Sequence, residues 1–248
     1  MIVDVHAHLG LDYTFDEKFL LEHQLDKIQR LEVDVTILQP GTCHNLEDVR
    51  REHDDIAAAV KAYPGMFRGM SNPSPHLKDA EYADEIRRCV EELGFIGIKL
   101  HPFAHGVNPV SRDGRKVFEA GAKYGVPVMV HTGAGIPFAN PINVLHIAKE
   151  YPQLKIILAH CGAMLMADET LTVMELCPNV FADTSWTPGF FIREGAHKIG
   201  ADRFMMGADH ADNCIVEITK IKNCGLDERQ QELVLGKTAA KIFDIKRE

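Results

Sequence analysis

The feature that most constrains the fold is a regular alternation of short β-rich segments with longer amphipathic ones. Eight segments have the composition of strands, and stretches with helical spacing of their apolar residues lie between them. The predicted strands are residues 2–6, 33–39, 66–71, 95–100, 126–131, 154–160, 179–183 and 203–208. The predicted helices are residues 16–31, 47–62, 78–93, 112–124, 142–150, 166–176, 189–199, 213–223 and 227–243. This order indicates parallel strands joined by helical crossovers.

Eight strand–helix units in about 210 residues predict an α/β fold, the (β/α)8 or TIM barrel, closed by C-terminal helices. A doubly wound open sheet is the alternative. It is disfavoured because no glycine-rich phosphate turn follows a strand and because polar residues recur at the strand ends. We expect residues 1–248 to form one domain, since a single barrel of this kind runs to roughly 250 residues.

Composition narrows the classes of partner. The formal net charge is -9, and no basic cluster is larger than the pair of Lys246 and Arg247, so no nucleic-acid partner is expected. No apolar run approaches the ~20 residues of a membrane span, and we expect no export signal before the first strand. The six cysteines lack CxxC spacing and are expected to be free thiols of a cytoplasmic protein.

Histidines gather at the carboxyl ends of the predicted strands. His6 and His8 end the first strand, His131 the fifth and His160 the sixth, while Asp209 follows the eighth. In a barrel these ends meet at one mouth, where imidazoles and a carboxylate form a transition-metal site, most often for zinc. One such histidine alone is more often a hydrogen-bonded core residue, but the joint set favours metal binding.

The spacing of the first pair predicts a shared face. In a regular strand His6 and His8 point the same way as Asp4, and Val3, Val5 and Ala7 point the other way.

Three further residues are candidate substrate contacts. Lys99 is a surface lysine, an anion-binding group or a carbamylated ligand that bridges two metals. His101 either lines the pocket or caps the turn before Pro102. Trp186, the only tryptophan, forms either a wall of the pocket or part of the packing.

The ordered motifs resemble the amidohydrolase superfamily, in particular the branch that contains aminocarboxymuconate-semialdehyde decarboxylase. They are DVHAHLG at 4–10, GIKLHP at 97–102, VPVMVHTG at 126–133, IILAHCG at 156–162, MMGADH at 205–210 and LGKTAAKIF at 235–243. The resemblance implies a metal-dependent barrel with four metal ligands, which are His6, His8, His131 and Asp209. It implies that His160 is a second-metal ligand or a catalytic residue. His210 follows Asp209 where members often show Gly-Ser-Asp-Tyr-Pro, which leaves the shape of the pocket wall open.

The leading functional prediction is hydrolysis of an amide, lactone or related carbonyl bond of a small molecule. A metal-activated water attacks, Asp209 accepts its proton, and His160 or Lys99 stabilises the oxyanion. The alternative is non-oxidative decarboxylation on the same metal, disfavoured because no arginine lies at the strand ends to hold a substrate carboxylate. A metal-binding protein without turnover is the third reading. One divalent ion, zinc by preference, is expected rather than two, and a homodimer is left open.

Overall fold

Two parallel sheets form the centre of the molecule. The structure, a computed structural model, describes residues 1–133 and 136–246. Within these residues the strand order is β2-β1-β3-β4 in one sheet and β5-β6-β7-β8-β9 in the other, and β2 alone is antiparallel to its neighbour. The strands are β1 (Val3–Asp12), β2 (Glu17–Phe19), β3 (Val35–Pro40), β4 (Phe67–Gly69), β5 (Ile98–Leu100), β6 (Val128–His131), β7 (Ile156–Ala159), β8 (Val180–Asp183) and β9 (Phe204–Met205).

Two seams of backbone hydrogen bonds join the sheets into a ring. At one seam Ala7 bridges Asp209, and the Asp209 N–H donates to the His6 carbonyl at 2.6 Å. At the other seam Ser71 bridges Ile98, and the Lys99 N–H donates to the Ser71 carbonyl at 2.7 Å. The predicted (β/α)8 barrel is therefore confirmed.

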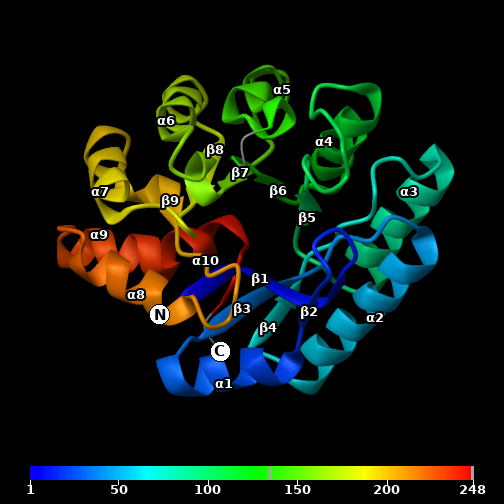
Figure 1. Cartoon of the computed structure of the whole chain (residues 1–248), viewed down its shortest axis with the longest axis horizontal. Helices are drawn as coiled ribbons and strands as arrows, with labels where there is room; N and C mark the ends of the chain where they lie inside the picture. The colour runs from blue at the N-terminus through cyan, green and yellow to red at the C-terminus, as the bar shows by residue number, and fades with distance from the viewer. Residues whose placement is uncertain (134–135, 247–248) are drawn as a thin grey trace.

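Helices surround this ring, as Figure 1 shows. They are α1 (Leu21–Leu31), α2 (Leu46–Ala62), α3 (Asp79–Arg87), α4 (Arg112–Tyr124), α5 (Leu145–Glu150), α6 (Ala167–Leu176), α7 (Gly189–Lys198), α8 (Cys214–Asn223), α9 (Glu228–Glu232) and α10 (Thr238–Ile242). Local capping sets several ends: the Asn45 side chain accepts the Asp48 N–H at the start of α2, and Gly125 ends α4 at φ 67°. None of the helices in the described residues is long and apolar enough to cross a membrane.

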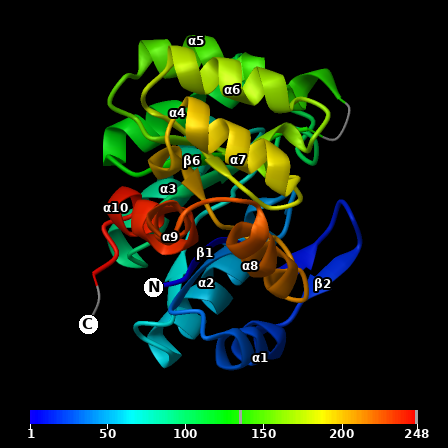
Figure 2. The ribbon, with the colours of Figure 1, turned by 90° about the vertical axis from the view of Figure 1, so that its left-hand side faces the viewer.

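The predicted helix over 16–31 is wrong at its beginning. β1 continues beyond its predicted end to Asp12, whose carboxylate accepts the backbone N–H groups of Thr14 and Phe15. That turn reverses the chain, and Glu17–Phe19 pair with β1 as strand β2. Helix α1 begins only at Leu21. Figure 2 shows the hairpin on the side of the molecule opposite α10.

Two apolar cores hold the barrel together. The inner core contains side chains from the strands, such as Val5, Met129 and Ile157, together with Ala239 and Phe243 at the end occupied by α10. The outer core lies between strands and helices and includes Ile98, Val130 and Leu158. Side chains alternate between these two cores along each strand. The carboxyl ends of the strands, beyond the inner core, present polar groups to the mouth.

Candidate metal centre

A β-bulge in β1 turns its two histidines toward the mouth. Asp4 pairs with Thr36 and Ala7 with Leu38, so β1 has one more residue than β3 between these pairs. Asp4 binds the Lys27 ammonium at 2.7 Å instead of sharing the face of the histidines, which corrects the prediction from regular alternation. Val5 lies in the inner core, and His6 and His8 both line the mouth.

The hydrogen bonds of His6 and His8 define which ring nitrogen carries the proton. His6 Nδ1 lies 2.6 Å from Asp183 Oδ2 and His8 Nδ1 lies 3.2 Å from the Pro40 carbonyl, so each Nδ1–H donates outward. Each Nε2 therefore carries a lone pair. Burial, followed by the charge of Lys99, lowers the pKa of His6, which keeps this imidazole neutral.

Asp209 completes a compact group of electron-pair donors. Its Oδ1 lies 3.2 Å from the Nε2 of His6 and 3.2 Å from that of His8, and the two nitrogens are 3.3 Å apart. Burial alone would raise the pKa of Asp209, but the neighbouring imidazoles of His6 and His8 outweigh it and lower that pKa. Three lone-pair atoms thus face one another without a proton assigned between them, an arrangement that a cation stabilises.

His131 and His160 form a second pair beside this group. His160 Nδ1 lies 2.8 Å from Ser185 Oγ, whose hydroxyl donates to Asp183, so His160 donates its Nδ1–H to Ser185. His160 Nε2 then accepts from His131 Nδ1 at 3.1 Å. His131 Nε2 is left buried without a hydrogen-bond partner. A buried nitrogen of this kind has a lone pair available for a ligand bond.

The structure brings together the residues predicted as metal ligands, with one difference in detail. Among the described residues, His6, His8 and Asp209 present ligand atoms within 4.8 Å of one another, and His6, His160 and Asp183 form another such group. His131 belongs to neither group, although it lines the same cavity. The donor set of imidazole nitrogens and one carboxylate fits zinc or a similar divalent ion.

Asp183 is a site residue that the sequence analysis missed. It ends β8, is fully buried, and orients His6 directly and His160 through Ser185. Gly207 leaves room for it, because a Cβ there would collide with Asp183 Oδ1 and approach the His6 Cβ at 2.8 Å. An aspartate at a strand end, two elements after a histidine strand, was the available signal.

Lys99 and His101 supply hydrogen-bond donors to the same cavity of about 80 Å³. Lys99 Nζ lies 2.8 Å from His6 Nε2, and burial lowers the pKa of Lys99 to about 8. His101 stacks on His131 with ring centroids 4.0 Å apart and accepts the Ala104 N–H at Nδ1. Its proton is therefore on Nε2. The surface position considered for Lys99 is wrong, since it is 1% exposed.

Trp186 lies at the rim of the mouth rather than in the lining of this cavity. Its indole Nε1–H donates to Asp209 Oδ2 at 2.7 Å, while half of its surface stays exposed. A contact between Trp186 and the substrate stays a prediction.

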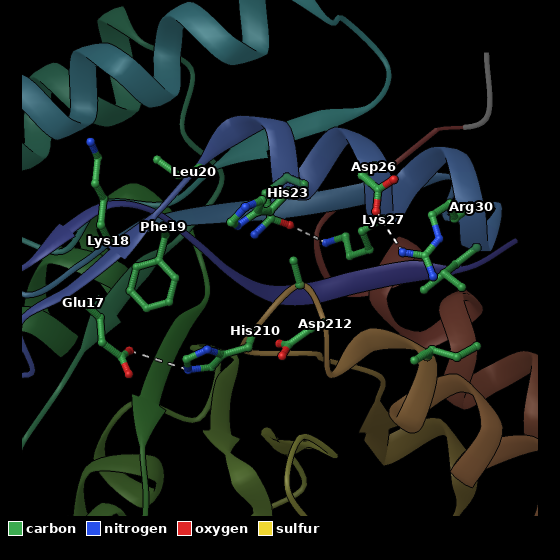
Figure 3. A pocket seen from close by; sticks show the side chains of 14 residues that line it. Glu17, Lys18, Phe19, Leu20, His23, Asp26, Lys27, Arg30, His210 and Asp212 are labelled. Carbon is green, nitrogen blue, oxygen red and sulfur yellow. Dashed lines mark hydrogen bonds and ion pairs between the residues drawn. The ribbon is translucent and has the colours of Figure 1, made fainter.

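A larger groove of about 510 Å³ adjoins the histidine-lined cavity, and Figure 3 shows it. It lies between β2, α1 and the loop that follows β9. Glu17, Phe19 and His210 line both spaces. His210 Nε2 lies 3.7 Å from a Glu17 carboxylate oxygen, so this pair and Phe19 form the wall between the groove and the mouth.

This molecule is thus a (β/α)8 barrel with a histidine-rich polar centre at the carboxyl ends of its strands. Residues 3–245 match the family described as Amidohydrolase, and the chain belongs to that family.

One curated relative shares 31% identity over 136 residues, the 2-keto-4-carboxy-3-hexenedioate hydratase of Sphingobium sp. (strain NBRC 103272 / SYK-6). The match covers 52% of this chain and about a third (35%) of that relative's length.

Solved structures of decarboxylases share the fold over nearly the whole chain. The 5-carboxyvanillate decarboxylase from Sphingomonas paucimobilis has a TM-score of 0.78 at 17% identity and covers 99% of both chains. The dihydroxybenzoic acid decarboxylase from Polaromonas sp. JS666, with bound manganese and 2-nitroresorcinol, has a TM-score of 0.80 at 17% identity. That similarity covers 100% of this chain and 98% of the other.

A 5-carboxyvanillate decarboxylase from Novosphingobium aromaticivorans DSM 12444, complexed with manganese and a nitrobenzoic acid, has a TM-score of 0.80 at 18% identity. It covers 99% of this chain and 96% of the other. At these identities the likeness establishes the fold.

Proposed function

We propose that this protein is a metal-dependent lyase that removes CO2 from a small carboxylic acid. The observation that carries the proposal is the buried Lys99 ammonium beside the three lone pairs of His6, His8 and Asp209. A cavity with a metal-ligand group and a buried cation is suited to a substrate with a carboxylate and a neighbouring oxygen. The decarboxylases of similar fold, two of them with bound manganese, support the same reading.

This proposal reverses the order of the sequence predictions, in which hydrolysis led. The absence of an arginine at the strand ends weighed against a decarboxylase. In the structure Lys99 Nζ and the Nε2–H of His101 provide hydrogen-bond donors in the cavity. They can take the role that an arginine would have in holding a substrate carboxylate. Hydrolysis of an amide or lactone remains the competing outcome of the test below.

Metal binding, substrate binding and proton transfer are assigned to different residues of the cavity. His6, His8, His131 and Asp209 would hold a divalent ion, which would supply Lewis-acid chemistry at a substrate oxygen. Lys99 and His101 bind and orient the substrate's anionic oxygens. When the C–C bond breaks, CO2 leaves and its bonding electron pair stays on the substrate carbon, which takes up one proton. Asp209 or His160 holds that proton at the mouth.

The experiment is an assay of the zinc-loaded and manganese-loaded protein on hydroxylated benzoates and other small carboxylic acids, with CO2 release as the readout. Amides and lactones are assayed in parallel. We expect metal-dependent CO2 release that is lost in His6→Ala. Lys99→Met should lower kcat/KM at least about 10²-fold, because a buried charge contact to the substrate is lost, while the exposed Lys198→Met serves as the control. Turnover of amides or lactones alone contradicts the proposal.

Hydration of a carbon–carbon double bond is a second candidate, favoured by the 31% identity to a hydratase. It needs the same anion donors and the same proton carriers, with water added rather than CO2 released. Unsaturated keto acids in the same panel, followed by loss of their ultraviolet absorbance, separate the two lyase reactions.

A further inference from the structure

The loop that follows β8 contacts both candidate proton carriers at the mouth, which are His160 and Asp209. Ser185 accepts from His160 Nδ1, and the next residue, Trp186, donates its indole N–H to Asp209 Oδ2 at 2.7 Å. Asp209 thus presents Oδ1 to the two Nε2 atoms while Oδ2 is held from the other side. A carboxylate constrained at both oxygens keeps one orientation toward a metal ion.

Helix α8 fixes the backbone of this loop. The Trp186 N–H donates to Glu217 Oε1 at 3.0 Å, and Lys220 lies 2.5 Å from Glu217 Oε2. Lys220 also donates to the Thr184 carbonyl at 2.9 Å. Glu217 is buried, so its bond to the Trp186 N–H is shielded from water.

Both residues of the Trp186–Asp209 hydrogen bond have a strained backbone conformation. Trp186 has φ 58° and Asp209 has φ 66°, both in the left-handed region that side-chain-bearing residues rarely adopt. His160, with φ 63°, is a third such residue at the mouth. Strained positions persist where surrounding contacts hold them, and here the strain aims the indole and the carboxylate at each other.

We propose that Trp186 is a positioning residue that holds Asp209 in its metal-binding orientation through the indole N–H. This inference rests on the metal centre of the proposed function. Since about half of the Trp186 surface (51%) is exposed, we assign its role to the hydrogen bond rather than to the burial of apolar surface.

The test uses zinc and the apoprotein, so it needs no substrate. Trp186 is the only tryptophan, so tryptophan fluorescence reports on this position alone. We expect zinc to change the emission saturably. Trp186→Phe keeps an aromatic ring but loses the N–H, and should weaken zinc affinity at least about 10-fold in chelator competition. The apoprotein melting temperature should stay unchanged. Phe190→Leu, which removes another exposed aromatic ring four residues along the chain, should bind zinc like the wild type.

The outcomes separate the two proposals. Wild-type protein that takes up no zinc contradicts the metal centre and the proposed function. Wild-type protein that binds zinc while Trp186→Phe binds it equally tightly overturns the positioning role alone. A loss of affinity in Phe190→Leu equal to that in Trp186→Phe overturns it as well, because a nonspecific rim effect then explains both.

Discussion

At the scale of single residues, the site depends on which atom of each side chain is already engaged. His6 donates from Nδ1 to Asp183, and this leaves Nε2 as the proposed ligand atom. Asp183 is not among the residues that line the cavity, yet it contacts His6 directly and orients His160 through Ser185. Residues of this kind are conventionally outside a ligand list, although they determine ligand geometry.

Asp183→Asn should therefore weaken metal binding. The amide oxygen can still accept the His6 proton, but the negative charge that strengthens this imidazole as a ligand is lost. We expect metal affinity to fall about 10-fold, the lower end for partners of metal-ligating histidines. Competition with a metal-sensitive dye measures the change. The exposed Asp202→Asn is the matched control, and an equal effect of the two substitutions would contradict the role of Asp183.

Asp209→Asn should separate metal binding from catalysis. His6, His8 and His131 remain as ligands, so the variant should retain substantial metal by elemental analysis. Its kcat should fall at least about 10²-fold, because the amide cannot carry the proton that the reaction needs. Turnover near the wild-type rate with metal bound would exclude Asp209 as the proton carrier and point to His160.

At the scale of elements, hydrogen bonds to a buried carboxylate connect helices α2 and α3 away from the mouth. Glu85 of α3 is fully buried and accepts hydrogen bonds from Arg50 and His53 of α2, at 2.7 Å each, and from Arg88. His53 Nε2 in turn accepts the Asn72 N–H beyond β4. The cluster with Cys89 has metal-ligand residue types, but its atoms are already engaged, which makes it a structural clamp.

The clamp predicts an acid-sensitive contribution to stability. Burial alone would raise the pKa of Glu85, but hydrogen bonds from His53, Arg88 and Arg50 outweigh it and hold the pKa well below its usual 4.5. A lowered folded-state pKa stabilises the fold above the unfolded-state pKa, and this stabilisation is lost as the pH falls below about 4. Glu85→Gln should cost about 2 kcal/mol at pH 7. It should also flatten the loss of unfolding free energy between pH 5 and 3, measured by urea denaturation; an unchanged pH profile would exclude the clamp.

At the scale of the whole molecule, the proposed metal centre joins strands from both sheets. His6 and His8 come from β1, His131 from β6, and Asp209 follows β9 across the seam at Ala7. An ion shared by these segments binds only the closed ring, since the unfolded chain does not bring the ligands together. Metal binding should therefore stabilise the folded barrel.

Added zinc or manganese should raise the melting temperature of the apoprotein. Ligand at about 1,000 times its Kd stabilises by about 4 kcal/mol, which corresponds to roughly 10 °C for a chain of this size. Scanning calorimetry with and without metal measures the shift. His131→Ala should lose most of the shift and keep the apoprotein melting temperature, whereas a metal effect preserved in that variant would place the ion elsewhere.

The sequence by itself determined the order of strands and helices and the histidines that lie at the mouth. Period-2 and helical patterns are local, so the eight barrel strands and most helices follow from them, as do the histidines at strand ends. The tertiary structure decided the bulge in β1, the hairpin at Glu17–Phe19 and the engagement of Asp183 and Trp186. Strand register and contacts such as that of His6 with Asp183, 177 residues apart, arise only when the ring closes, and no local pattern encodes them.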